Sequence, residues 1–301
     1  MSINCDSIVV VQGYNEGLLS GKHTLKLVVD NFNINIEQSG VRKIQIVSNK
    51  KFFISELLNC FNILDKLIML VEGVFIPVKS IVVYNGDDDV TGLPEVQKII
   101  ESRIIFTSNK IFNNKGKFFN WYDVIDENVF INWKKLLDEL DIVHQVVLYN
   151  SGDLDYPIDA KVANIIEVCE ALVEIVKIYT GKFHDLHPGE KDTPLKKCIA
   201  ELIDEYGMDI FYKEYHSKKD AFLKISKDSR TRIMHIKRKY PKNYFSGQES
   251  LIYLAKYTFL YRHILLQLLG IDYKKYREHL IQCVASLDKF NGIVDNMLEH
   301  L

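Results

Sequence analysis

NWKKLLDELDIVHQVV, residues Asn132–Val147, divides the chain into two parts with different periodicities. Asn132 can cap a helix, because its side-chain oxygen can accept backbone N–H groups of the first turn. Apolar residues then recur at helical spacing: Trp133, Leu136, Leu137, Leu140, Val143 and Val147. The helical period continues to the C-terminus, so we expect the second part of the chain to be all-helical.

The part before Asn132 is rich in strand patterns. Four segments alternate or carry β-branched runs between Asn, Gly and Ser, and two more strands are expected later: SIVVVQGY, HTLKLVVD, NFNINIEQ, VRKIQIVS, IPVKSIVVYNG and SRIIFTS. Between these two groups, Ile54 to Val71 has apolar residues at helical spacing and predicts a helix packed on the sheet. Residues 85–92 and 113–117 have the composition of turns or loops.

Helix start and stop signals divide the second part into about six helices. One follows the YPID turn and carries a wide apolar stripe from Val162 to Val176. The next is bracketed by Thr193, Pro194 and Gly207; later ones start at Ser217 with Asp220, at Ser246 with Glu249 ending at Gly270, and at about Asp272. The predicted fold class is α+β, with a β-rich domain over residues 1–128 and a helical bundle over 129–301.

Bulk composition is that of a folded, soluble protein, with 47% hydrophobic and 26% charged residues among 301. The five cysteines are widely spaced, which indicates reduced thiols in a cytoplasm and argues against zinc. The N-terminus lacks a signal-peptide pattern, and the apolar stretch Phe61 to Tyr84 is interrupted by charges and Pro77. We therefore expect a cytoplasmic protein that does not associate with membranes.

Positive charge is concentrated in one segment of a chain whose net charge is −2. Residues 218–242 hold ten Lys or Arg against two Asp or Glu, whereas the other residues hold 28 against 38. This basic segment contains SRTRIMHIK, residues Ser229–Lys237, in which Arg230 precedes His235 by five positions. The coincidence indicates an anion-binding site.

Arginine and histidine together can cleave RNA without a metal. Histidine titrates near neutral pH and can serve as base or acid, while arginine stays charged and its planar fork fits phosphate oxygens. In a straight helix, however, five residues advance by about 500°, which leaves the two side chains roughly 140° apart. The site therefore requires a helix that begins or bends near Ser229, or a second copy of the pair supplied by a dimer.

The order of motifs resembles that of the HEPN superfamily, which is marked by an R-x4-6-H motif in an all-α bundle. FLKISKD precedes the motif and YLAKYTFLYRHILLQLLGI follows it, and FLYRHILL with QLLGI is similar to the ApeA-like branch. Upstream, NWKKLLDELD and IIEVCEALVEIVK resemble the passage from the ApeA N-terminal domain into the bundle. The resemblance covers about residues 130–285.

This resemblance implies a metal-independent endoribonuclease that needs no cofactor and acts as a homodimer through the bundle. Arg230 would bind the phosphate and His235 would transfer protons, giving a 2′,3′-cyclic phosphate or 3′-phosphate and a 5′-hydroxyl. Such nucleases are common in antiphage defence, abortive infection and toxin–antitoxin systems, so the substrate would be RNA, including tRNA, and a regulator or phage-derived trigger would control it.

Two positions depart from the family's pattern. Thr231 replaces the usual Asn, Asp or His after the motif arginine, and would support the site through its hydroxyl. Lys237 stands where silenced toxins carry a tyrosine, so a nucleotidyltransferase antitoxin is not expected. The alternative function is a catalytically degenerate bundle that serves for dimerisation or RNA binding.

Residues around the motif are candidates for RNA contact. Arg232, Lys237, Arg238 and Lys239 would meet the phosphate backbone, with the flanking Lys218, Lys219, Lys224, Lys227 and Lys242. Tyr240, Tyr244 and Phe245 can stack on unpaired bases; the alternative is a solvated helix face followed by core aromatics.

Other groups are weaker candidates. Asp87–Asp89 and the pair His184 and His187 could suggest metal sites, but a surface loop explains each, and no metal is expected. A phosphodiesterase or metal hydrolase using Asp87–Asp89 is a third possible function. His263 and His279 are expected in the core or in an interface. No P-loop, G-x-S-x-G or GxGxxG motif is present.

Overall fold

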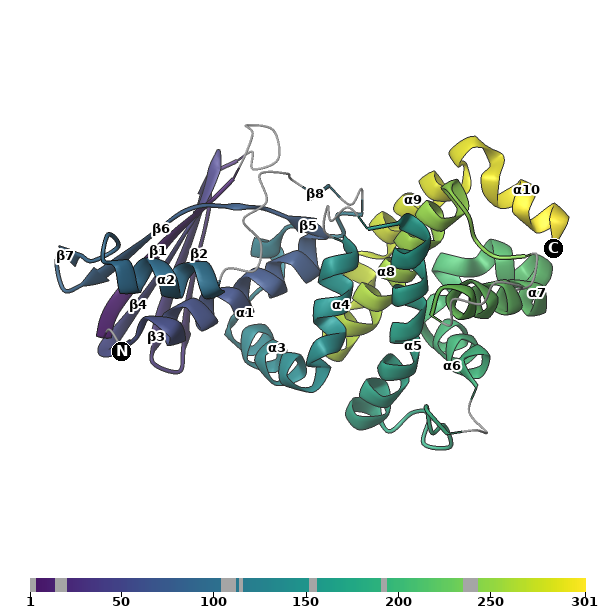
Figure 1. Ribbon diagram of the computed structural model, residues 1–301, viewed down its shortest axis with the longest axis horizontal. Coiled ribbons are helices and arrows are strands. Elements are labelled where there is room, and N and C mark those ends of the chain that lie inside the picture. Colours follow the sequence, from purple (N-terminus) through teal and green to yellow (C-terminus); the bar gives the residue numbers. More distant parts are fainter. Residues whose placement is uncertain are drawn as a thin grey trace. The chain divides into compact units, whose positions relative to one another are not determined.

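The computed structural model describes residues 4–13, 21–103, 112–113, 116–151, 156–190, 194–234 and 243–301. Two compact units comprise residues 1–113 with 119–137, and residues 114–118 with 138–301. The first holds an antiparallel sheet and the second is helical, which confirms the α+β class (Figure 1). The division falls inside helix α3 (Glu127–Leu140), because the Trp133 indole donates to the Ile63 carbonyl and joins the start of α3 to the sheet unit.

The first unit is built on a six-stranded antiparallel sheet in the order β2-β3-β4-β1-β6-β7. Side chains alternate along its strands, so that Ile8 and Val10 are buried while Val9 and Val11 are partly exposed. A second, two-stranded sheet pairs β5 with β8. The strands are β1 (Asn4–Gln12), β2 (His23–Val29), β3 (Phe32–Ser39), β4 (Val41–Phe53), β5 (Val74–Phe75), β6 (Val78–Asn85), β7 (Asp88–Asp89) and β8 (Phe112–Asn113).

Helix α1 (Ile54–Glu72) packs on β1 and β4, as the spacing of its apolar residues predicts. It ends at Gly73, whose φ of 69° is the left-handed conformation that glycine adopts without strain. The unit also contains α2 (Pro94–Arg103) and the 3-10 turn η1 (Trp121–Asp123). The first two residues of the strand predicted for SRIIFTS are helical instead, because Ser102 and Arg103 end α2. Helix α2 begins at Pro94 and contains several good helix formers. Residues 104–108 lie outside the described residues.

Polar side chains lie between the sheet and α1. Gln12 donates to the Asp65 carboxylate at 2.6 Å, and Arg42, across the strand pair from Gln12, donates to Glu72 at 2.7 Å. The oxygen of Gln38 accepts from Arg42 and from the Trp121 indole. These bonds pair charged groups where water is scarce, and those from Gln12 and Arg42 fix α1 against the sheet.

Asp65→Asn is expected to stabilise the first unit at neutral pH. Burial raises the pKa of Asp65 from 3.8 to about 6, with the Gln12 hydrogen bond opposing the rise. The folded state therefore binds the proton more tightly than the unfolded state, and stability falls as pH rises from 3.8 through 6. Asparagine keeps the oxygen that accepts from Gln12 and does not ionise, so we expect a gain of about 1–3 kcal/mol at pH 7 that disappears near pH 3.5.

Urea unfolding followed by tryptophan fluorescence measures this effect. The chain has two tryptophans, Trp121 and Trp133, and both lie in the sheet unit. Asp87→Asn, in the exposed turn between β6 and β7, is the control and should change stability by less than about 0.5 kcal/mol. Equal stabilisation by both variants, or none by Asp65→Asn, would contradict the prediction.

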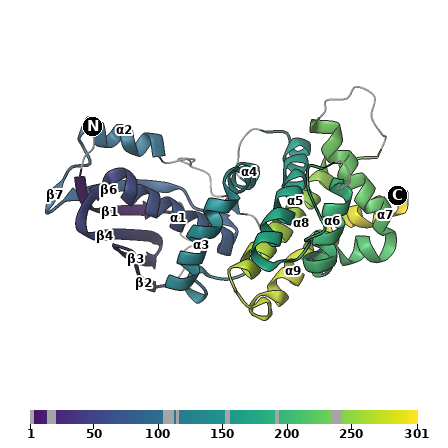
Figure 2. The same cartoon turned by 90° about the horizontal axis from the view of Figure 1, so that it is seen from below.

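The helical unit is organised around α5 (Ile158–Thr180), which packs against α4, α6, α7 and α8 (Figure 2). Its predicted apolar stripe is buried, including Val162, Ile166 and Val173. No helix in the described part of the chain is long and apolar enough to cross a membrane. The other elements are α4 (Ile142–Ser151), α6 (Leu195–Leu202), the π-helical turn η2 (Ile203–Gly207), α7 (Met208–Met234), α8 (Gln248–Leu268), η3 (Tyr273–Lys275), α9 (Arg277–Asp288), η4 (Phe290–Gly292) and α10 (Ile293–His300).

Several helix boundaries differ from the prediction. Asn132 does not cap a helix, because α3 begins at Glu127, and the helix expected to run to Val147 is interrupted between α3 and α4 at Asp141, whose φ is 41°. Gly207 does not stop a helix, because the backbone continues through η2 directly into α7. The start expected at Ser217 corresponds to a kink inside α7, where Lys218 has a non-helical backbone (φ −149°, ψ 45°). The single helix expected after Asp272 is broken, since Asn291 and Gly292 both have positive φ between α9 and α10.

Candidate active site

Arg230 lies near the C-terminal end of α7, four residues before Met234, and is paired with Glu167 of α5. Its Nη2 donates to Glu167 Oε1 at 2.6 Å and its Nε donates to Oε2 of the same carboxylate. The two helices pack side by side, so the pair ties them together. A bidentate contact fixes the guanidinium plane as well as its position, while the Arg230 side chain remains 19% exposed.

A second carboxylate adds negative charge beside this pair. Glu170 lies one turn after Glu167 on α5, and burial together with the Glu167 charge raises the pKa of Glu170, against the pull of Arg230. The hydrogen bonds that Arg230 donates to Glu167 raise the pKa of Arg230 in turn. The sequence analysis did not predict a role for these two glutamates. Their spacing of three residues on an otherwise apolar helix, IIEVCEALVEIV, is the sequence feature that indicates them.

The side chains on either side of Arg230 are engaged with backbone. Ser229 donates to the Ile225 carbonyl and accepts from the Phe245 backbone N–H, both at 2.8 Å, which holds the start of the 243–247 segment against α7. Thr231 is buried and donates to the Lys227 carbonyl at 2.8 Å. The Thr231 hydroxyl is therefore engaged within its own helix.

The two described aromatics after the motif have different surroundings. Tyr244 is partly exposed, and the guanidinium carbon of Arg232 lies 3.5 Å from its ring centroid. Phe245 is 1% exposed and stacks on Tyr253 with ring centroids 4.1 Å apart. Phe245 thus belongs to the core, and its predicted stacking on a base is wrong.

A helix that begins or bends near Ser229, one of the two alternatives for bringing Arg230 and His235 together, is not seen in the described part of α7. The only non-helical backbone angles in α7 are at Phe211 and Lys218, and the helix is regular from there to Met234. The described residues do not include the second half of the motif or the residues just after it: His235, Lys237, Arg238, Lys239, Tyr240 and Lys242. Because His235 lies outside the described residues, the roughly 140° separation expected on a straight helix stays a prediction.

Part of the basic cluster is neutralised by acidic partners. Lys219 pairs with Asp204 at 2.8 Å, and Arg230 pairs with Glu167. Lys218, Lys224 and Lys227 are exposed on the same helix. The positive surface of α7 available to an anion is therefore smaller than the count of lysines suggests.

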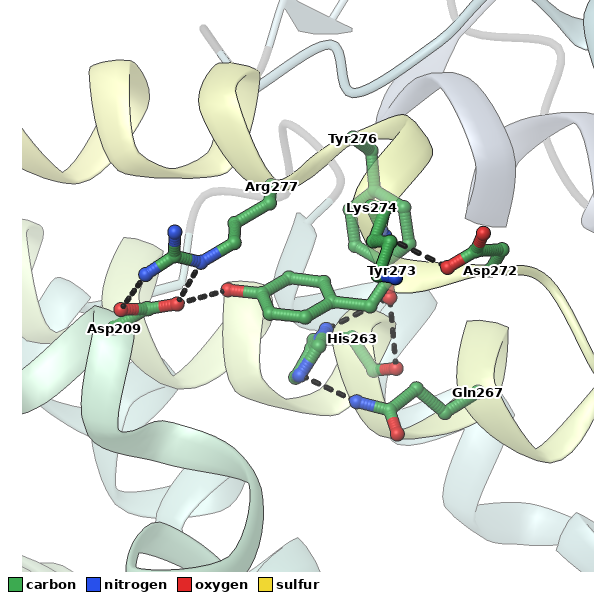
Figure 3. A network of polar contacts seen from close by, with 8 residues as sticks. All are labelled: Asp209, His263, Gln267, Asp272, Tyr273, Lys274, Tyr276 and Arg277. Carbon is green, nitrogen blue, oxygen red and sulfur yellow. Dashed lines mark hydrogen bonds and ion pairs between the residues drawn. The ribbon is translucent and has the colours of Figure 1, made fainter.

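A second polar cluster joins α7, α8 and the segment from η3 into α9 (Figure 3). Arg277 pairs with Asp209 through two bonds of 2.8 and 3.1 Å, and Tyr273 donates to the same carboxylate at 2.5 Å. The His263 ring contacts the Tyr276 hydroxyl through Nδ1 and the Gln267 amide through Nε2, both at 2.7 Å. His263 is 2% exposed, which confirms the expected core position, whereas His279 is exposed.

The helical unit is expected to lose stability as the pH falls from 6.5 to 4 because of His263. Burial lowers the pKa of His263 from 6.5 to about 4, with Asp209 opposing the fall, and the facing Tyr206, Tyr273 and Tyr276 do not titrate in this range. Between these two pKa values the unfolded state binds a proton at His263 and the folded state does not. About 2–3 kcal/mol of the free energy of unfolding that is present above pH 6.5 is therefore lost by pH 4.5. Urea unfolding followed by circular dichroism at 222 nm measures this, and His263→Gln should flatten the slope while His279→Gln should not.

The remaining candidates for metal sites are surface features. Asp88 and Asp89 form β7, and the Asp89 carboxylate accepts the Thr91 backbone N–H at 2.9 Å. His184 and His187 are exposed and contact Asp185 and Lys177. Among the described residues, no group of three His, Cys, Asp or Glu side chains is arranged to hold a metal ion.

Comparison with protein-family models, curated proteins and solved structures finds no match for this chain. What the chain does must therefore be inferred from its own residues. Of the predicted site residues, the structure describes Arg230, Thr231 and Arg232, all on one helical turn of α7. It adds Glu167 beside the first and Tyr244 beside the last.

Proposed function

We propose that the chain is a metal-independent endoribonuclease in which Arg230 binds the scissile phosphate and His235 transfers protons. The observation that carries the proposal is the fixed orientation of Arg230 by Glu167, since a guanidinium held in one plane needs no reorganisation to meet a phosphate. His235 would accept the 2′-hydroxyl proton as that oxygen attacks phosphorus. Protonation of the departing 5′-oxygen then leaves a 2′,3′-cyclic phosphate.

Contacts beyond the reacting phosphate belong to the same proposal. Arg232, Lys237, Arg238 and Lys239 would bind the RNA backbone, which needs no base-specific arrangement. Two chains would pair through the helical bundle and bring two motifs to one cleft. The setting would be bacterial defence in the cytoplasm, where cleavage of RNA or tRNA halts an infected cell once a regulator or phage-derived trigger releases the enzyme.

A non-catalytic RNA-binding or dimerisation module is the second candidate. The burial of Thr231 and the pairing of Arg230 with a carboxylate favour it, because an ion pair attracts phosphate less strongly than an isolated cation. Incubating the purified chain with labelled RNA in EDTA separates the two. Cleavage to 5′-hydroxyl ends supports the nuclease; binding without cleavage supports the module; cleavage that requires magnesium contradicts the metal-free mechanism.

Glu167→Gln is expected to tighten RNA binding several-fold. The substitution removes a negative charge that contacts Arg230 and leaves an amide oxygen that can still accept one N–H. Kd for a non-cleavable 2′-O-methyl oligonucleotide should fall, and the fall should shrink as salt screens the charge. Glu174→Gln, two turns further along α5 beside Lys177, is the matched control. Equal effects of both variants would exclude a specific role for Glu167.

A further inference from the structure

A pocket of about 420 Å³ opens in the helical unit beside the turn of α7 that precedes the motif. Its apolar lining comes from Ile225 of α7 and Met297 of α10, both of which are buried. The polar lining includes Tyr244, which precedes α8, Glu249 in the first turn of α8, and Asn296 and His300 of α10. The volume lies in the range of sites that hold a small organic ligand.

Tyr244 gives this pocket a rigid aromatic wall. The Arg232 guanidinium covers the tyrosine ring at 3.5 Å, and the following residue, Phe245, is anchored in the core through its backbone bond to Ser229. A ring that is held in this way can stack on a flat ligand at little entropic cost. Nucleobases are the flat ligands that proteins commonly bind on tyrosine. Arg232, against the Tyr244 ring, adds positive charge near the pocket that would attract the phosphate of a nucleotide.

Glu249 gives the pocket a carboxylate of fixed position. Its Oε2 accepts the Ser246 backbone N–H at 3.2 Å, the reciprocal half of a capping arrangement at the start of α8. Across the pocket, the imidazole of His300 is oriented by a 2.6 Å bond from Nδ1 to the Asn296 carbonyl. The pocket therefore presents an acceptor on α8 and an amide donor, from Asn296, on α10.

Among the four RNA bases, guanine matches this arrangement. Its Watson–Crick edge places N1–H beside the N2 amine, two adjacent donors that one carboxylate can accept together, whereas adenine, cytosine and uracil set an acceptor beside their donor. The O6 and N7 acceptors of guanine lie on the adjoining Hoogsteen edge and can accept from the Asn296 amide. Adenine would instead place a lone pair against Glu249.

We infer that this pocket binds a guanine base, stacked on Tyr244 and bonded through its Watson–Crick edge to Glu249. This pocket then serves the proposed nuclease function, on which this step rests, by selecting a guanosine near the bond that Arg230 and His235 cleave. Tyr244 and Glu249 are then specificity residues, distinct from the catalytic pair.

Titration of the full chain with GMP and IMP tests the pocket without any cleavage, because inosine lacks the N2 amine and loses one of the two bonds to Glu249. We expect GMP to bind about tenfold more tightly than IMP. Glu249→Gln should reduce this ratio to less than about twofold, since an amide donor then faces the second base donor while the amide oxygen can still cap Ser246. Glu278→Gln, an exposed first-turn glutamate of α9, is the matched control and should keep the ratio.

Tyr244→Ala should weaken GMP and IMP equally, by about tenfold, and Tyr244→Phe should keep binding, because it preserves the ring. No binding of either nucleotide, equal affinity for both, or an unchanged ratio in Glu249→Gln would overturn the inference. A second arm uses 2′-O-methyl octamers with a single guanosine or inosine. Discrimination between GMP and IMP without discrimination between these octamers would assign the pocket to a free guanine nucleotide and overturn its role in RNA selection. The nucleotide titration and the octamer titration both measure binding alone. A negative result in either is therefore distinct from a failure of the proposed nuclease function.

Discussion

His235→Ala is expected to lower the rate of RNA cleavage in EDTA by at least about 100-fold. General acid–base catalysis by one side chain contributes roughly 10²–10⁴-fold, and alanine cannot exchange a proton in either step. Cleavage rates at saturating RNA, followed by gel electrophoresis of a labelled strand, measure the effect. His279→Ala, an exposed histidine on α9, is the control and should cleave at the wild-type rate.

The same assay with Arg230 variants separates binding of the phosphate from proton transfer. Arg230→Ala removes the phosphate contact and leaves Glu167 beside the site with its charge uncompensated, so we expect loss of activity on the same scale. Arg230→Lys keeps the charge and loses the fork that pairs with Glu167, and should recover only part of the rate. Cleavage that survives His235→Ala would rule out the assignment of the catalytic pair, and circular dichroism confirms that each variant is folded.

Lys256→Met is expected to destabilise the helical unit by about 3–5 kcal/mol, a large share of the stability of a typical domain. Lys256 Nζ is completely buried and lies 2.6 Å from both Glu214 Oε1 and Asp288 Oδ1. The Tyr253 hydroxyl also donates to Glu214, at 3.1 Å. Removing the ammonium leaves the buried Glu214 carboxylate and the partly exposed Asp288 carboxylate without a cation, and the unpaired buried charge costs more than the lost contact itself.

Urea unfolding followed by circular dichroism at 222 nm measures this loss, since most helices belong to this unit. Lys196→Met, which breaks the surface pair with Asp220, is the matched control and should cost less than about 1 kcal/mol. Adding Glu214→Gln to Lys256→Met removes one unpaired charge and should recover part of the loss. Equal destabilisation by Lys256→Met and Lys196→Met would show that the buried cluster is not coupled in this way.

Signals that act within one helix or strand could be read from the sequence. The apolar stripes of α1, α5 and α8 and the alternation of β1 to β4 depend on spacing along the chain, and all of these elements form where the pattern predicts. Helix breaks were less predictable. Gly207 does not end a helix because the backbone continues through η2 into α7, whereas the break at Asn291 coincides with an Asn-Gly dipeptide, a turn signal that the prediction did not use.

For the candidate site, the sequence by itself determined the composition: a basic helix, an arginine and a histidine in one motif, and aromatics after it. Only the tertiary structure decided which of these groups meet. The Arg230–Glu167 pair joins residues 63 positions apart, and the ring of Tyr244 lies against Arg232 and lines a pocket with residues of α10. Such contacts follow from how helices pack, and helix packing depends on the whole buried surface rather than on the spacing within any one segment.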